Sequence, residues 1–216
     1  MRPVAACNRH LLALLVSGLA LVACTPPEPI RLGFIGGLSG RVADLGQSGR
    51  NGFQLAVEQT NAAGGVLGRN IEIIVKDDNQ DKTRATRSAE ELASARVAAI
   101  IGPMTSAMAE VALPIAQQAG VVLVSPTVTA RKFFGLEDNL FLLMSSTREE
   151  ARLSAEFHFN ENGARRVAAI QDLKNRAYTE SWLREFTVAF QGLGGEVFPV
   201  AYESGSEVTF GSVVRA

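Results

Sequence analysis

Short apolar runs rich in β-branched residues alternate along this chain with longer segments in which apolar residues recur every three or four positions. The first four runs are continuous in their apolar character, and they occupy residues 32–35, 71–75, 97–101 and 121–124. Continuous runs are typical of strands buried on both faces, and the spacing between them is typical of amphipathic helices. The order β-α-β-α-β-α-β predicts an α/β fold with a parallel sheet covered by helices on both faces.

The same alternation continues around a polar break at Ser145-Ser146-Thr147. We expect three further strands, at residues 140–144, 167–170 and 197–201. Helices are expected from 147 to 162, along the apolar stripe of Trp182, Phe186, Phe190 and Leu193, and at residues 209–216. The break predicts two lobes, residues 30–145 and residues 146–216. Because two strands bury their helices poorly, we expect the second lobe to be incomplete within this chain.

The N-terminal residues resemble the export signal of a bacterial lipoprotein. Arg2 and Arg9 precede an apolar run at residues 11–21, which is too short to cross a bilayer as a helix, since that needs about 20 residues. The run ends at Leu21-Val22-Ala23-Cys24, which resembles a lipobox. We expect a signal peptide at 1–23, a lipid on Cys24, a Pro-rich spacer at 24–29, and a membrane-anchored protein in the periplasm or at the cell surface. The alternative is that Cys24 is an ordinary residue of a signal peptide cleaved elsewhere.

The composition argues against several classes of function. Lys and Arg total 21 and Asp and Glu total 22, so the formal net charge is -1 and no basic surface for nucleic acid is predicted. Once residues 1–23 leave, Cys24 and His158 are the remaining cysteine and histidine, which argues against a disulfide and a cysteine-based metal site. The chain has neither a nucleophile elbow nor a phosphate loop. We expect no enzyme activity, no metal and no cofactor.

The acidic run Asp77-Asp78-Asn79-Gln80-Asp81 has two interpretations. It begins like a calcium-binding EF-hand loop, but Lys82 occupies the position where the turn needs glycine, and Ser88 occupies that of the bidentate glutamate. The other interpretation, which we favour, is a polar strand end that leads into a capped helix.

Three of the predicted strands end in segments of small residues and hydroxyls. These segments are Gly36-Gly37-Leu38-Ser39-Gly40, Gly102-Pro103-Met104-Thr105-Ser106-Ala107 and Ser125-Pro126-Thr127-Val128-Thr129-Ala130. Ligands of open α/β sheets bind at the carboxyl ends of the strands. A site built from these segments can bind an anion, but it contains no acid or base that could react with it.

These three segments, together with residues 61–68 and Asp77-Asp78, resemble the type I periplasmic binding proteins, and among them the leucine/isoleucine/valine-binding group of ABC importers. The resemblance runs from about Ile30 to the last residue and preserves the order and spacing of five segments. It implies two α/β lobes, joined by a hinge, that close on an amino-acid-like ligand. It also implies an ABC permease and ATPase as partners, and we expect a monomer.

The resemblance implies roles for individual residues. Ser106 and Thr129 match the serine and threonine that meet the ligand carboxylate, and Thr127 matches a position where backbone groups receive the ammonium. Tyr178 matches the tyrosine that covers the ligand. Ser106 also begins a predicted helix, whose free N–H groups and dipole favour an anion.

Each of these assignments has a simpler alternative. Ser106 could only cap its helix, although Ala109 rules out the reciprocal capping box. Thr127 could be a solvated loop residue, and Tyr178 could lie on a helix surface.

Thr105, Ser39 and Arg41 complete the set of candidate ligand contacts. If Arg41 points inward, it favours a ligand with a second acidic group, and otherwise it is a surface arginine. Leu45 stands where many family members place an aromatic residue. The acidic partner of the ligand ammonium is expected beyond Ala216, so we expect the chain as given to bind its ligand poorly.

These observations favour an extracytoplasmic substrate-binding lipoprotein of an ABC transporter, which binds a branched-chain-type amino acid or a related small carboxylate for uptake. The alternative function is that of a ligand sensor with the same fold, responsive to an amide or an amino acid and without a role in transport.

Overall fold

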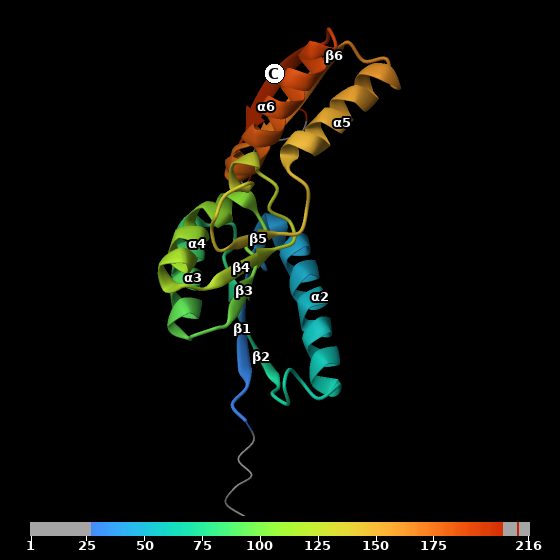
Figure 1. Cartoon of the computed structure of the whole chain (residues 1–216). Helices are drawn as coiled ribbons and strands as arrows, with labels where there is room; N and C mark the ends of the chain where they lie inside the picture. Colours follow the sequence, from blue (N-terminus) through green and yellow to red (C-terminus); the bar gives the residue numbers. More distant parts are fainter. Residues whose placement is uncertain (1–26, 205–210, 212–216) are drawn as a thin grey trace, which may run out of the picture.

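The computed structural model describes residues 27–204 and residue 211. The predicted signal peptide, Cys24 and, apart from residue 211, the predicted helix at 209–216 lie outside these residues. The described chain forms two separate parallel sheets, one of five strands and one of two strands (Figure 1). We call the first sheet with its helices the large unit (residues 30–142) and the second with its helices the small unit (residues 147–202).

The five-stranded sheet has the order β2-β1-β3-β4-β5, and each neighbouring pair is parallel. Its strands are β1 (Ile30–Gly36), β2 (Ile71–Asp77), β3 (Ala99–Ile101), β4 (Val122–Ser125) and β5 (Leu140–Leu142). All five predicted strands are confirmed. The strand predicted at 140–144 ends early because its partner β4 ends at Ser125, which pairs with Leu142.

Helices cover both faces of this sheet, with α2 on one face and with α3 and α4 on the other (Figure 1). Their bounds are α2 (Ala43–Ala62), α3 (Lys82–Ser94) and α4 (Ser106–Ala119). Two short 3-10 helices, η1 (Gly40–Val42) and η2 (Arg131–Phe133), lie in the connections. Among the described helices, none combines the length and the apolar character that crossing a membrane requires.

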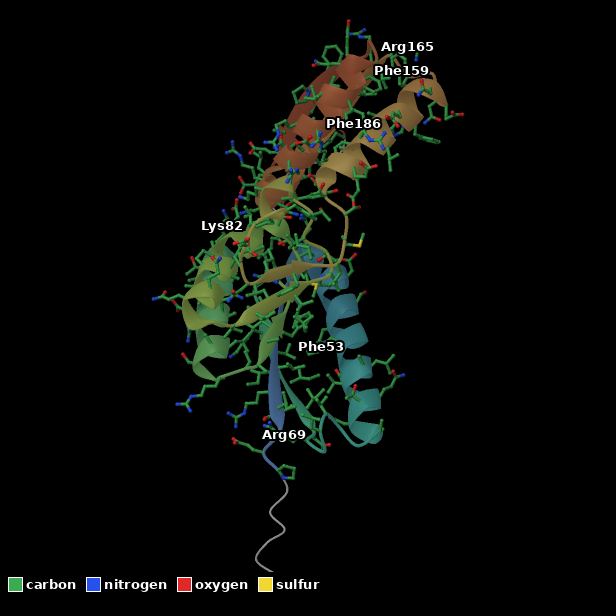
Figure 2. All side chains as sticks on the ribbon, in the orientation of Figure 1. Phe53, Arg69, Lys82, Phe159, Arg165 and Phe186 are labelled. Atoms are coloured by element: carbon green, nitrogen blue, oxygen red, sulfur yellow. The ribbon has the colours of Figure 1, made fainter. Side chains whose placement is uncertain are left out.

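The core of the large unit lies between the sheet and the pair α3 and α4. Ile35, Leu92, Ile100 and Leu123 are fully buried there. On the opposite face Phe53 points from α2 toward the sheet (Figure 2), and its ring lies 6.3 Å from that of Phe34. The central strand β1 is therefore covered on both sides, as its continuous apolar sequence predicts.

The small unit consists of two helices and two strands. Their bounds are α5 (Thr147–Asn160), β6 (Arg166–Asp172), α6 (Arg176–Gly192) and β7 (Glu196–Tyr202), with the 3-10 helix η3 (Leu173–Asn175) before α6. The predicted elements are confirmed, and α5 ends two residues earlier than expected. One face of this sheet is open within the described residues, since Ile170 is 51% exposed and Phe198 is 43% exposed.

Aromatic stacking along α6 forms the core of the small unit. The ring centroids of Trp182 and Phe186 are 4.8 Å apart, and those of Phe186 and Phe190 are 5.3 Å apart. Figure 2 shows Phe186 between α5 and α6. The prediction that Leu193 extends this apolar side is wrong, because α6 ends at Gly192 and Leu193 is 37% exposed.

Polar contacts join the two units at the N-terminal half of α6. The buried Ser181 hydroxyl accepts the Arg131 N–H at 3.0 Å and lies 2.8 Å from the Thr147 hydroxyl. The Asn175 side-chain oxygen accepts the Ala107 N–H at 3.1 Å. These bonds hold α6 next to the start of α4, at the strand-end edge of the large sheet.

A steric constraint at Gly46 fixes how α2 meets the end of β1. A Cβ on Gly46 would lie 2.0 Å from the backbone oxygen of Gly37, which cannot move aside without moving the loop. We expect Gly46→Ala to lower the free energy of unfolding by about 1–3 kcal/mol in urea titrations. Gly52→Ala, in the same helix, is the control, because its Cβ would meet nothing within 4 Å. That control is expected to be stabilising by up to about 1 kcal/mol, and equal losses in both variants would contradict the constraint.

Candidate ligand-binding site

A pocket of about 340 Å³ lies between the strand ends of the large sheet and the small unit. Its size is suitable for a small molecule. Five of the predicted contacts line it: Thr105, Ser106, Thr127, Thr129 and Tyr178. The other lining residues are Leu45, Met104, Pro126, Met144, Glu150 and Asn175.

The pocket forms where the loops after β3 and β4 leave adjacent parallel strands. Gly102 has a φ of 109°, and a Cβ there would lie 2.1 Å from the Ile35 oxygen, so only glycine allows the chain to pass this close to β1. The Ser125 hydroxyl donates to the Pro103 carbonyl at 2.7 Å and accepts the Val128 N–H at 3.1 Å. One serine therefore joins the two loops that form the pocket wall.

Ser106 is the first residue of α4 and is almost fully buried. The N-cap residue is Thr105, and its side chain makes no capping hydrogen bond. The Ser106 hydroxyl instead accepts the Ala130 N–H at 3.3 Å, which fixes the end of the β4 loop against the helix. The alternative that Ser106 caps α4 is therefore wrong, because the helix begins at Ser106 itself.

Thr105, directly before Ser106, also lines the pocket. Its side chain is buried, and its Oγ1 has no hydrogen-bond partner among the described residues. The first N–H groups of any helix lack intrahelical partners and carry the positive end of the helix dipole. A buried hydroxyl and a helix N-terminus at one wall can together bind an anionic group.

Thr127 and Tyr178 complete the walls in different ways. The Thr127 hydroxyl donates to the Met104 carbonyl at 2.7 Å, so its side chain already serves the fold, and only its backbone remains for other contacts. Tyr178, in the first turn of α6, is half-buried. Burial raises the pKa of its phenol, and the negative charge of Glu150 raises it further, so Tyr178 is a neutral hydrogen-bonding group.

Ser39 and Arg41 do not line the pocket. The Ser39 hydroxyl donates to Asp77 Oδ2 at 2.5 Å and lies 3.1 Å from Asn79 Oδ1. Arg41 forms an ion pair with Asp172 at 2.6 Å, and so connects the loop after β1 to the end of β6. Both side chains are engaged in contacts that position the loops beside the pocket.

Met144, Glu150 and Asn175 also line the pocket, although they were not predicted from the sequence. They come from β5's exit loop, from α5 and from η3, and no motif or spacing links them to the hydroxyl segments of the large unit. For Glu150, the available signal was its position in the first turn of the helix predicted from 147 to 162, directly after a strand.

The acidic run Asp77–Asp81 after β2 leads into a capped helix, which is the interpretation that the sequence favoured. The Asp81 carboxylate accepts the Arg84 N–H at 2.8 Å and caps α3. Burial raises the pKa of Asp78 to about 6, against the Gln80 N–H bond that lowers it. Burial also acts on Asp77, but hydrogen bonds from Ser39 and nearby backbone N–H groups hold its pKa below the usual range.

In the part of the chain that the structure describes, no group of three His, Cys, Asp or Glu side chains could hold a metal ion.

An open parallel sheet, a pocket at its strand ends and a second α/β unit facing that pocket define a small-molecule binding protein. Residues 29–216 match the model of the periplasmic binding protein family, and the chain belongs to this family. Its fold is that of the type I members. The family and the relatives described next are substrate-binding proteins rather than enzymes.

Three relatives illustrate the similarity. The Leu/Ile/Val-binding protein BraC3 of Rhizobium johnstonii is 29% identical over 166 residues, which are 76% of this chain and 45% of that protein. The leucine-binding protein LivK of Thermotoga maritima superposes with a TM-score of 0.78 at 26% identity over 86% of this chain and 52% of that one. LivJ of Streptococcus pneumoniae, solved with isoleucine, gives 0.78 at 26% identity over 87% and 53%. This chain therefore spans about half the length of these relatives.

The raised pKa of Asp78 predicts a pH dependence of stability. The folded state holds the Asp78 proton more tightly than the unfolded state, so the favourable contribution is complete below about pH 4 and is lost as the pH rises through about 6. Asp78→Asn keeps the oxygen that accepts the Gln80 N–H but removes the charge. Relative to the native chain, this variant should gain about 2 kcal/mol of unfolding free energy between pH 4 and pH 7.

Urea titrations at several pH values test this gain. Asp77→Asn is the matched control, because the lowered pKa of Asp77 gives the opposite sign: its charged form stabilises the fold, and the variant should lose stability relative to the native chain as the pH rises. A flat difference between the native chain and Asp78→Asn would contradict the prediction.

Proposed function

We propose that this chain is the extracytoplasmic substrate-binding component of an ABC transporter and that it binds a branched-chain-type amino acid or a related small carboxylate for uptake. The observation that carries the proposal is the buried Thr105 hydroxyl, which lines the pocket at the start of α4 without a partner in the described chain. A ligand carboxylate would supply the missing acceptor. The ligands in the names of the relatives belong to the same chemical class.

The chemistry of the pocket fits such a ligand. Thr105, Ser106 and Thr129 surround the anionic end, where each hydrogen bond to a charged group contributes about 1.5–3 kcal/mol. An apolar stem would pack against side chains from four different segments, which are Leu45, Met104, Pro126 and Met144. Tyr178 would cover the ligand from the small unit, and the backbone of Thr127 would face its amino end.

The location and the partners follow from the same proposal. We infer that residues 1–23 direct export, that Cys24 carries a lipid, and that residues 24–29 are a spacer before a first lobe at 30–145 and a second at 146–216. Anchored in this way outside the cytoplasm, a monomer would present the bound ligand to an ABC permease and its ATPase. Lipid anchoring keeps the binding protein close to that partner.

Removing the Thr105 hydroxyl separates ligand binding from folding. Thr105→Val loses no hydrogen bond to the described chain, so the midpoint of thermal unfolding should stay the same or rise slightly. The affinity for leucine, measured by calorimetry, should fall about tenfold, which is about 1.4 kcal/mol. Ser106→Ala is the comparison: it also removes the bond to the Ala130 N–H, so stability and affinity should both fall. Unchanged leucine affinity in Thr105→Val would contradict the carboxylate role.

Lipid attachment is tested at the two cysteines. Cys24→Ala should abolish incorporation of labelled palmitate and leave an unlipidated protein outside the membrane fraction or as uncleaved precursor. Cys7→Ala is the control, because Cys7 lies within the segment proposed to be removed. This variant should incorporate labelled palmitate as the native chain does. Normal labelling of Cys24→Ala would show that the anchor is elsewhere or absent.

A further inference from the structure

The dipeptide Asn-Gly occurs twice in the sequence, at Asn51-Gly52 and at Asn162-Gly163. All four residues are exposed, but the structure places the two copies in different backbone environments. Asn51 and Gly52 lie inside α2, whereas Asn162 and Gly163 lie in the connection between α5 and β6. Figure 1 shows this connection at the end of the small unit that is farther from the large unit.

The chain is held on both sides of Gly163, but the N–H of Gly163 itself is not. The Asn162 N–H donates to the Phe157 carbonyl at 3.2 Å, and the Ala164 N–H donates to the His158 carbonyl at 3.0 Å. The Gly163 N–H has no hydrogen-bond partner among the described residues. The Asn162 side chain has one such partner, since its Nδ2 donates to His158 Nδ1 at 3.0 Å. Because that bond is exposed, water can replace it at little cost in free energy.

The two glycine nitrogens therefore differ in how easily another group can reach them. Gly163 has a φ of 66°, and a Cβ there would meet nothing within 4 Å, so the space around it is open. Gly52 lies in the interior of α2, where each backbone N–H donates to the carbonyl four residues earlier. Freeing the Gly52 nitrogen requires local unfolding of the helix.

We propose that Asn162 is a site of spontaneous deamidation, and that Asn51, which has the same following residue, is protected by α2. The Gly163 nitrogen forms a bond to Asn162 Cγ, and the bond from Cγ to Nδ2 breaks. The amide nitrogen leaves as ammonia with the proton of the Gly163 N–H. One water molecule then opens the resulting five-membered imide, which leaves aspartate or isoaspartate at this position. Glycine favours the ring closure because it has no Cβ beside the attacking nitrogen.

The product differs from the native chain in charge and in one hydrogen bond. It carries a new carboxylate just after the end of α5, where the helix dipole disfavours a negative charge. It also lacks the donor that Asn162 gives to His158. The modified chain should therefore separate from the native chain by anion exchange, and peptide mass mapping should locate the change.

Incubation of the folded 216-residue chain in mildly alkaline buffer tests the proposal. Asn162 should deamidate at least about tenfold faster than Asn51, because only the second site needs local unfolding. In concentrated urea, where α2 is lost, the two rates should agree within about threefold. Folded-state rates that are equal, or that are faster at Asn51, would overturn the proposal.

Two variants test the chemistry at Asn162. Asn162→Gln keeps the side-chain amide but lengthens the side chain by a methylene, so the five-membered imide cannot form and the charge change should disappear. Gly163→Ala places a Cβ beside the attacking nitrogen and should slow the reaction about tenfold. Circular dichroism confirms that each variant is folded. An unchanged rate at Asn162 in folded Gly163→Ala would overturn the proposed route.

Discussion

The parallel ladder of β1, β3 and β4 is the constraint on which the rest of this structure depends. Because the three strands run in the same direction, the loops after β3 and β4 leave the sheet at one edge and meet there. Gly102 lets the first of these loops pass against the Ile35 carbonyl, and Ser125 then joins it to the second. The position of the start of α4, and of the Thr105 hydroxyl that has no partner among the described residues, follows from that geometry.

Binding a ligand as small as an amino acid requires contacts from both units. Micromolar affinity for a ligand with about nine non-hydrogen atoms corresponds to about 0.9 kcal/mol per atom, which is close to the upper limit for very small ligands. A single strand-end edge leaves much of such a ligand in water. In the described chain, α5 and α6 add Glu150 and Tyr178 to the pocket that the hydroxyl segments of the large unit line.

Among the described residues, the contacts between the units comprise hydrogen bonds, the ion pair of Arg41 with Asp172, and the packing of Ala177 against the apolar cluster of Ala85, Ala107 and Met108. Polar contacts join Arg41 to Asp172, Ala107 to Asn175, and Arg131 to Ser181. Their small-unit partners lie between the end of β6 and the N-terminal half of α6. Interfaces of this polar kind separate more readily than apolar cores, since water can replace their hydrogen bonds. Each unit has its own main apolar core, so relative movement would expose only the small cluster at Ala177.

The sequence by itself determined the elements and the hydroxyl wall. Strand and helix periodicity is a local property, and segments at the ends of parallel strands must meet, so Thr105, Ser106, Thr127 and Thr129 were predictable together. Tertiary structure alone decided which side chains of the loops face the pocket. Ser39 and Arg41 follow β1 as expected, yet they turn to Asp77 and to Asp172, residues brought near by packing. Glu150 lines the pocket for the same reason, because the partners of a side chain that are distant in sequence are set by how the units pack and not by any local pattern.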